Sequence, residues 1–275
     1  MLVSEKFYSI QGEGKTTGVP SYFIRLANCN LNCGSSPKEI SAVRKNPENY
    51  IAGEWKGETH LNGKASWTCD TIKVWVKGTE ISNQQIIEDW KNEGIYEDIK
   101  KGVIHVIFTG GEPTLPKHQI SIVEFTNWWK EEEQIHWPLY NTSNRPFYEI
   151  ETNGTVFIED ELFGYIDQIN CSPKLSNSGN DLRLRYNEKA LRRIMEHSNY
   201  QFKFVISKEE DLKEIFDEYI NKLNIPLKNI HCMPGLDSRE DFYERNLFVW
   251  EMSKKYKFIA SSRMHVAVYN KMTGV

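Results

Sequence analysis

The stretch Val103-Ile-His-Val-Ile-Phe-Thr-Gly-Gly-Glu-Pro113 carries the strongest strand signal in the chain and ends in a glycine-rich turn. Its first part is apolar or β-branched apart from one histidine, which is typical of a buried strand. The adjacent glycines allow a ligand to approach the backbone closely, and Glu112 offers a carboxylate suited to an ammonium group. The sequence therefore predicts a strand whose carboxyl end opens into a binding loop.

Short runs of the same kind recur along the chain, and helical patterns separate several of them. We predict strands at residues 21–26, 103–108, 147–151, 166–171, 202–206 and 230–233. We predict helices at residues 84–100, 120–133, 212–220 and 239–256. Ser82 with Gln85, and Ser207 with Glu210, have capping-box spacing at two of the helix starts. Alternating strands and helices indicate parallel βαβ units, whose ligands gather at the carboxyl ends of the strands.

Length and composition limit the class of protein. The chain has 275 residues, 39% of them hydrophobic, and a net charge of −4. This length supports a sizeable core, and no repeat or flexible linker divides it, so we expect one α/β domain over residues 1–275. The mild acidity and the lack of a long basic stretch argue against a nucleic-acid-binding protein. Because no long apolar run or signal peptide is present, we expect a soluble cytoplasmic protein without membrane contact.

The cysteines suggest metal chemistry. Their number, five, is odd in a long chain, which makes a disulfide framework a poor explanation. Cys29 and Cys33 follow the first predicted strand, and Cys69 comes after a polar, irregular stretch at residues 34–68 that reads as an insertion. Three thiolates could hold an iron-sulfur cluster with one open iron, or a zinc ion together with a histidine. Cys171 and Cys232 lie in apolar strand patterns and are expected in the core.

Combined with Thr109-Gly-Gly-Glu-Pro113, the three cysteines resemble the pattern of the radical S-adenosylmethionine (SAM) superfamily. Within it, the order of motifs is similar to that of the 7-carboxy-7-deazaguanine synthase family. The matching segments are Phe7-Tyr-Ser-Ile-Gln-Gly-Glu-Gly14, residues 18–26, Cys29-Asn-Leu-Asn-Cys33, Cys69-Asp-Thr71, Glu151-Thr-Asn-Gly154, Ser172-Pro-Lys174 and residues 265–275. The long interval between Cys33 and Cys69 departs from the usual superfamily spacing.

The resemblance implies a partial or modified TIM-like radical SAM barrel with an inserted cluster loop at about residues 34–68. It implies the conversion of 6-carboxy-5,6,7,8-tetrahydropterin to 7-carboxy-7-deazaguanine with loss of ammonia, a lyase step in queuosine and 7-deazapurine biosynthesis. The implied cofactors are a [4Fe-4S] cluster, SAM and Mg2+, and the radical derives from them rather than from a catalytic side chain. A flavodoxin- or ferredoxin-like electron donor and a homodimer are also implied.

The resemblance also gives roles to single residues. Cys29, Cys33 and Cys69 would hold the cluster, and Thr71 would hold Mg2+. The expected SAM-binding residues are Gly111, Glu112, Glu151, Asn153, Ser172, Pro173 and Lys174. The expected substrate-binding residues are Ile10, Gln11, Gly12, Arg25 and Thr109, with the terminal carboxylate of Val275 as a further contact. The planar guanidinium of Arg25 suits the carboxylate of a pterin.

Two alternatives compete with this interpretation. Another radical SAM enzyme, such as a glycyl-radical activase, would share the cluster and the glycine-rich loop but would not need Arg25 or the Gln-Gly-Glu-Gly segment. A zinc-binding interaction module would use Cys29, Cys33, Cys69 and a histidine. The identity of the bound metal and turnover with carboxytetrahydropterin separate the three hypotheses.

Overall fold

The computed structural model describes residues 1–46, 65–133, 145–236, 238–270, 272 and 274–275. In these ranges the strands form a single sheet in the order β3-β1-β2-β4-β5-β6-β7-β8-β9. The strands are β1 (Leu2–Ile10), β2 (Pro20–Leu26), β3 (Thr79–Glu80), β4 (His105–Gly110), β5 (Tyr148–Thr152), β6 (Gln168–Cys171), β7 (Tyr200–Ile206), β8 (Ile230–Pro234) and β9 (Ile259–Ala260). All six predicted strands are confirmed.

Parallel pairing dominates this sheet. Neighbouring strands from β2 to β9 run parallel, while β1 pairs antiparallel with both β2 and β3. Because β3 and β9 are separate edges, the sheet is open rather than closed into a full barrel. The predicted α/β class with a partial barrel is therefore confirmed.

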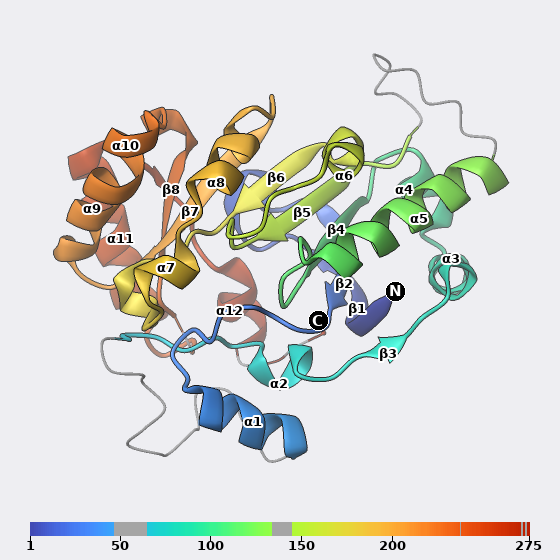
Figure 1. Ribbon diagram of the computed structural model, residues 1–275, viewed down its shortest axis with the longest axis horizontal. Helices are drawn as coiled ribbons and strands as arrows, with labels where there is room; N and C mark the ends of the chain where they lie inside the picture. Colours follow the sequence, from blue (N-terminus) through green and yellow to red (C-terminus); the bar gives the residue numbers. More distant parts are fainter. Residues whose placement is uncertain (47–64, 134–144, 237, 271, 273) are drawn as a thin grey trace.

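Helices connect most of the parallel strands. In Figure 1, α5, α6 and α8 lie in the upper half of the view beside the strands, α1 and α2 lie at the bottom, and α12 lies near the middle. The helices are α1 (Pro37–Lys45), α2 (Ile72–Trp75), α3 (Asn83–Asn92), α4 (Tyr96–Lys100), α5 (Pro116–Glu132), α6 (Asp160–Tyr165), α7 (Leu182–Arg185), α8 (Glu188–Met195), α9 (Glu209–Glu214), α10 (Asn221–Leu223), α11 (Phe242–Tyr256) and α12 (Met264–Tyr269). No helix in the described ranges has the length and apolar character that crossing a membrane would require.

The two faces of the sheet differ because successive side chains of a strand point to opposite sides. One face joins apolar side chains of the strands to those of the covering helices in one large core. Trp90 of α3 and Trp129 of α5 pack there with a ring separation of 5.0 Å, and Tyr22 of β2 packs edge-on against Trp90. Cys171 and Cys232 are fully buried in the same core, as predicted. The other face carries polar side chains and forms the floor of the site described below.

Several local predictions need correction. The predicted helix at residues 84–100 is two helices, because Gly94 adopts a positive φ of 71° between α3 and α4. Only one half of the capping box predicted at its start forms: the Gln85 N–H donates to the Ser82 hydroxyl at 3.1 Å. The Gln85 amide instead donates to Asp89.

The second predicted capping box, Ser207 with Glu210, is wrong. The helix begins one residue later, with Lys208 at the N-cap. Asp211, rather than Glu210, accepts the free backbone N–H groups of Ser207 and Lys208, at 2.7 and 3.2 Å. A carboxylate near the start of a helix also interacts favourably with the helix dipole.

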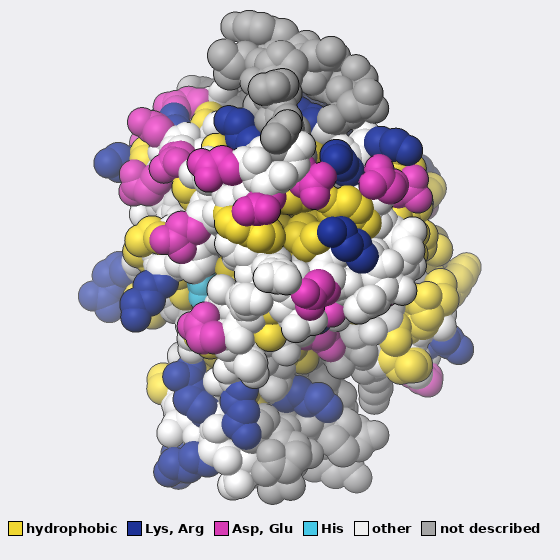
Figure 2. Space-filling model, turned by 90° about the vertical axis from the view of Figure 1, so that its right-hand side faces the viewer, with side chains coloured by type: hydrophobic (Ala, Val, Ile, Leu, Met, Phe, Trp, Pro, Cys, Tyr) yellow, Lys and Arg dark blue, Asp and Glu magenta, His cyan; other side chains and the backbone are white. Residues whose placement is uncertain are grey.

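The stretch at residues 34–68 is not irregular throughout. Residues 37–45 form α1, which Ser36 and Glu39 cap reciprocally, and Ile40 and Val43 pack against Ile72 and Trp75 of α2. Residues 47–64 lie outside the described ranges, so the extent of the predicted insertion stays a prediction. On the face shown in Figure 2, basic side chains gather at the lower end and both signs of charge are mixed elsewhere.

Candidate active site

A cavity of about 240 Å³ opens at the carboxyl ends of the parallel strands. Its lining comes from β1 and β2, from the cysteine loop, from the ends of β4 to β8 and from the last residues of the chain. Open α/β sheets bind their ligands at this edge, because the loops that follow the strands converge there.

Most of the residues singled out in the sequence line this cavity. They are Ile10, Gln11, Gly12, Arg25, Cys29, Cys33, Cys69, Thr71, Thr109, Gly111, Glu151, Asn153, Ser172, Lys174 and Val275. Glu112 and Pro173 are not part of its lining. The fold thus brings together in one cavity the motifs that lie far apart in the sequence.

Glu112 lies beneath the cavity and is fully buried. Its carboxylate accepts hydrogen bonds from the Thr152 hydroxyl and the Asn153 N–H, both at 2.7 Å, and from the N–H and hydroxyl of Thr114. Glu112 therefore holds the loop after β5 in place. Its expected contact with the amino group of SAM stays a prediction.

Two glycines allow the loop after β4 to pack against the cysteine loop. Gly110 has a φ of 111°, which favours glycine. A Cβ on Gly111 would lie 1.8 Å from the carbonyl oxygen of Asn28, the residue before Cys29. The same carbonyl accepts the N–H of Glu112 at 2.9 Å. The backbones are therefore in direct contact, and a side chain at position 111 would separate them.

The three candidate cluster cysteines line the same cavity, and the five cysteines of the chain form no disulfide. The N–H of Cys69 donates to the carbonyl of Cys33 at 3.1 Å, which joins the two ends of the interval at residues 34–68. Burial raises the pKa of Cys33 to about 11 and that of Cys29 further, and the other cysteines add to both shifts. Thiolates at these positions therefore need a compensating positive charge. Among the described residues, no group of three or more His, Cys, Asp or Glu side chains is arranged to hold a metal ion.

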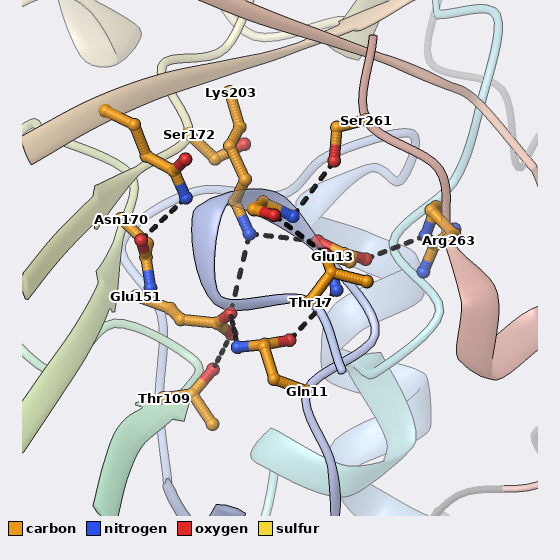
Figure 3. Close-up of polar contacts among 12 residues, drawn as sticks. Gln11, Glu13, Thr17, Thr109, Glu151, Asn170, Ser172, Lys203, Ser261 and Arg263 are labelled. Carbon is orange, nitrogen blue, oxygen red and sulfur yellow. Dashed lines mark hydrogen bonds and ion pairs between the residues drawn. The ribbon is translucent and has the colours of Figure 1, made fainter. Parts of the chain in front are cut away.

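A lysine on the polar face of the sheet forms the centre of a network that the sequence motifs did not reveal. Lys203 of β7 is 3% exposed, and its Nζ lies 3.0 Å from Glu13 Oε2 and 3.4 Å from Glu151 Oε1. The second carboxylate also accepts from the Gln11 amide at 3.1 Å and the Thr109 hydroxyl at 2.7 Å (Figure 3). Burial alone would lower the pKa of Lys203, but the two carboxylates outweigh it and raise the pKa. Lys203 is therefore charged.

Glu13 joins this lysine to the C-terminal part of the chain. Arg263 donates to Glu13 at 3.0 Å and also pairs with Asp70, the residue after Cys69. Burial opposes the ionisation of Glu13, but Lys203 and Arg263 outweigh burial and hold its pKa well below the usual range. Sequence reasoning missed Lys203 and Arg263, although one signal was present: a lysine within the apolar strand segment Tyr-Gln-Phe-Lys-Phe-Val-Ile at residues 200–206.

Arg25 projects from β2 at the other side of the cavity. Its Nε lies 3.3 Å from a carboxylate oxygen of Glu5, and its guanidinium stacks 5.2 Å above the ring of Phe7. The end of the chain lies close by, since a Cβ on Gly274 would lie 2.7 Å from Glu5. Val275 and Arg25 thus line the same cavity.

A partial barrel whose first parallel strand is followed by a three-cysteine loop, and whose next strand ends in Gly-Gly-Glu-Pro, is the arrangement of a radical SAM enzyme. No family model matches the chain. The chain is 31% identical over 241 residues to the 7-carboxy-7-deazaguanine synthase of Clostridium acetobutylicum, covering 84% of this chain and 80% of that protein. It is 28% identical over 254 residues to the one of Rhodopirellula baltica, covering 85% and 73%. The chain belongs to the 7-carboxy-7-deazaguanine synthase family.

The fold has a counterpart among solved structures. The crystal structure of QueE from Escherichia coli superimposes with a TM-score of 0.54 at 20% identity, covering 95% of this chain and 92% of that one. At this identity the likeness concerns the fold. It agrees with the open, partial barrel described above.

Proposed function

We propose that this chain converts 6-carboxy-5,6,7,8-tetrahydropterin to 7-carboxy-7-deazaguanine with loss of ammonia. The observation that carries the proposal is one cavity that combines three cysteines, the glycine-rich loop after β4 and a set of charged and amide side chains from β1, β2, β5 and β7. Family membership supports the same reaction. A glycyl-radical activase would have no use for the polar set of Gln11, Arg25 and Glu151.

Cys29, Cys33 and Cys69 would hold a [4Fe-4S] cluster, and the loops with Gly111, Asn153, Ser172 and Lys174 would hold SAM. The cluster and SAM supply the radical chemistry when bound. The thiols fit such a group, because they are gathered in one cavity where burial opposes their ionisation, and the positive charge of bound iron would favour it. A cubane binds each thiolate at a separate corner, so its ligands need not converge on one point as those of a single ion do.

The loop after β5 is rigid enough to place a ligand. The amide of Asn153 donates to Asn30 at 2.9 Å, and the Asn30 amide donates to the Thr155 hydroxyl at 2.7 Å. The Thr155 hydroxyl in turn donates to Asn153 at 2.6 Å, which closes the ring. The cysteine loop and the proposed SAM loop are thereby held in a fixed relative position.

The side of the cavity formed by β1 and β2 offers groups that match a carboxylated pterin. The guanidinium of Arg25 would bind the carboxylate in a bidentate manner. The Gln11 amide and the backbone of residues 10–12 would read the donor and acceptor edge of the heterocycle. We place Glu151, which the resemblance assigns to SAM, on the substrate side: Lys203 pairs with its carboxylate, which accepts from Gln11 and Thr109 and would also accept a substrate N–H.

The remaining assignments concern Mg2+, the electron donor, the oligomeric state and the location. The Thr71 hydroxyl lines the cavity 3.3 Å from the sulfur of Cys69. A single threonine is a weak ligand for Mg2+, so we expect this ion to bind only together with the substrate. From the family resemblance we also propose a flavodoxin- or ferredoxin-like electron donor and a homodimer. We propose a cytoplasmic location from the sequence patterns given above.

Anaerobic reconstitution tests the proposal. The protein with iron, sulfide, SAM, Mg2+, a reductant and carboxytetrahydropterin should yield 7-carboxy-7-deazaguanine without net consumption of SAM. Cys69→Ala should lose both the cluster absorbance and the product, whereas the core variant Cys232→Ala should keep both. A colourless protein that retains zinc and takes up no iron would refute the proposal. Consumption of SAM without conversion of the pterin would favour another radical SAM reaction.

A further inference from the structure

The sulfur of Cys33 accepts a hydrogen bond from a side chain outside the cysteine motif. The amide nitrogen of Asn180 lies 3.4 Å from Cys33 Sγ, 147 residues away along the chain. Asn180 stands between the 3-10 turn Ser176–Ser178 and α7. Neither the motif comparison nor the spacing of the cysteines points to this residue.

The other two cysteines have contacts of a different kind. Cys29 Sγ accepts the backbone N–H of Leu31 at 3.5 Å, within its own loop. Cys69 Sγ lies 3.3 Å from the hydroxyl of Thr71, two residues further on, and either atom could be the donor. Of these three contacts, only the one at Cys33 has a partner that lies far away in the sequence.

The orientation of the Asn180 amide is fixed by its neighbours. Its side-chain oxygen accepts the backbone N–H of Asn32 at 3.1 Å, a group that can only donate. The nitrogen must therefore point the other way, where it donates to the Ser178 hydroxyl at 3.1 Å and to Cys33 Sγ. The backbone is held as well, because the Gly34 N–H donates to the Ser178 carbonyl at 2.8 Å. Asn180 thus binds the cysteine loop through its oxygen and the sulfur through its nitrogen.

We infer that Asn180 raises the reduction potential of the cluster through its hydrogen bond to Cys33, an inference that rests on the proposed cluster. A donor to a ligand sulfur stabilises negative charge on the cluster, and the reduced form carries more of it than the oxidised form. The bond therefore makes the reduced cluster easier to reach. Asn180 is a positioning and tuning residue that contacts a ligand of the cluster.

Midpoint potentials measured by EPR-monitored titration of the reconstituted protein test this inference. Asn180→Leu removes the donor and should lower the ratio of reduced to oxidised cluster about tenfold at a fixed ambient potential, about 59 mV for one electron. Asn180→Asp keeps an oxygen for the Asn32 N–H but replaces the donor by a negative charge. At about pH 8, well above the usual pKa of aspartate, it should lower the potential further.

A matched control removes an asparagine that does not bind a sulfur. Asn187 caps α8 through the Ala190 N–H and donates to the Thr155 carbonyl, so Asn187→Ala should keep the wild-type potential. If Asn180→Leu lowers the potential while Asn180→Asp does not, the side chain acts only by holding the loop, and the inference is overturned. Wild-type potentials in both variants overturn it too.

Failure of this inference can be distinguished from failure of the proposed cluster. If Asn180→Leu takes up no cluster, the comparison of Asn180→Asp with the wild type decides alone, and an equal or higher potential in the variant overturns the inference. If the wild-type protein itself takes up no iron and sulfide, the proposed cofactor fails before the tuning role is reached.

Discussion

The two faces of the same strands serve different purposes. On β7, Phe202, Phe204 and Ile206 point into the core below the helices, while Lys203 between them points into the cavity. The apolar face is stabilised by burial, which depends on volume and tolerates changes of chemistry at constant shape. The polar face depends on paired charges, where the loss of one partner leaves the other buried and unpaired. Substitutions at adjacent positions of one strand should therefore differ in their effects: those on the apolar face should affect stability alone, and those on the polar face should also affect activity.

The largest effect is expected from Lys203→Met. This change leaves Glu151 and part of the Glu13 carboxylate without their buried cation. The free energy of unfolding should fall by about 3–5 kcal/mol. Product formation should be lost, because Glu151, the proposed acceptor for the substrate, is no longer held in place. Urea unfolding and product assays measure both. The exposed-residue variant Lys228→Met is the control and should stay within about 0.5 kcal/mol of the wild type. Equal stabilities of the two variants would contradict the role of the network.

Phe204→Ala tests the opposite face at the next position. The ring is fully buried and lies 4.9 Å from the ring of Tyr219, so its removal leaves a cavity in the core. We expect a loss of about 3–5 kcal/mol in the free energy of unfolding. Below the unfolding temperature, however, KM for the pterin should stay within about twofold, since this side chain points away from the cavity. A large rise in KM would show that the two faces are not independent.

The pH dependence of stability should also arise on the polar face. Burial, with the charge of Lys203, lowers the pKa of His231 on β8 to about 4. In the unfolded chain this histidine takes up its proton near pH 6.5, so the unfolded state binds more protons below that pH. Stability should therefore fall as the pH is lowered from about 6.5 towards 4.5, by about 2–3 kcal/mol. In His231→Gln this part of the pH dependence should disappear in urea titrations. An unchanged slope would exclude His231 as its source.

Much of the fold could be predicted because it depends on local patterns. The apolar strand runs and the stripe at Leu212, Ile215 and Tyr219 reflect one buried face each, which is visible in any short window of sequence. The split at Gly94 and the helix α1 were missed, since a single glycine and a short capped helix change little in such a window. The boundaries are decided by particular hydrogen bonds, such as those to Asp211.

The candidate site was predictable only where it coincided with motifs. The Glu13–Lys203 pair joins residues 190 positions apart, and the Glu13–Arg263 pair joins residues 250 apart. Each partner by itself is an ordinary charged residue, and only the tertiary fold brings the loop residues Glu13 and Arg263 to the strand residue Lys203. Glu112 shows the reverse case: the motif drew attention to it, but its observed partners are the loops around it rather than the cavity.

The smallest effect is expected from Arg25→Lys, which keeps the charge on the polar face of β2 and changes only its shape. Lysine cannot bind a carboxylate through two parallel N–H groups, so we expect KM for the pterin to rise about tenfold, equivalent to about 1.4 kcal/mol. The free energy of unfolding should change by less than about 0.5 kcal/mol, because the pair with Glu5 is retained. Arg183→Lys on the exposed surface of α7 is the matched control and should leave KM unchanged. Because Ile24, the residue before Arg25, is buried in the core, a rise in KM without loss of stability would separate the two faces at neighbouring positions of one strand. Equal KM values for Arg25→Lys and its control would show that Arg25 does not bind the substrate.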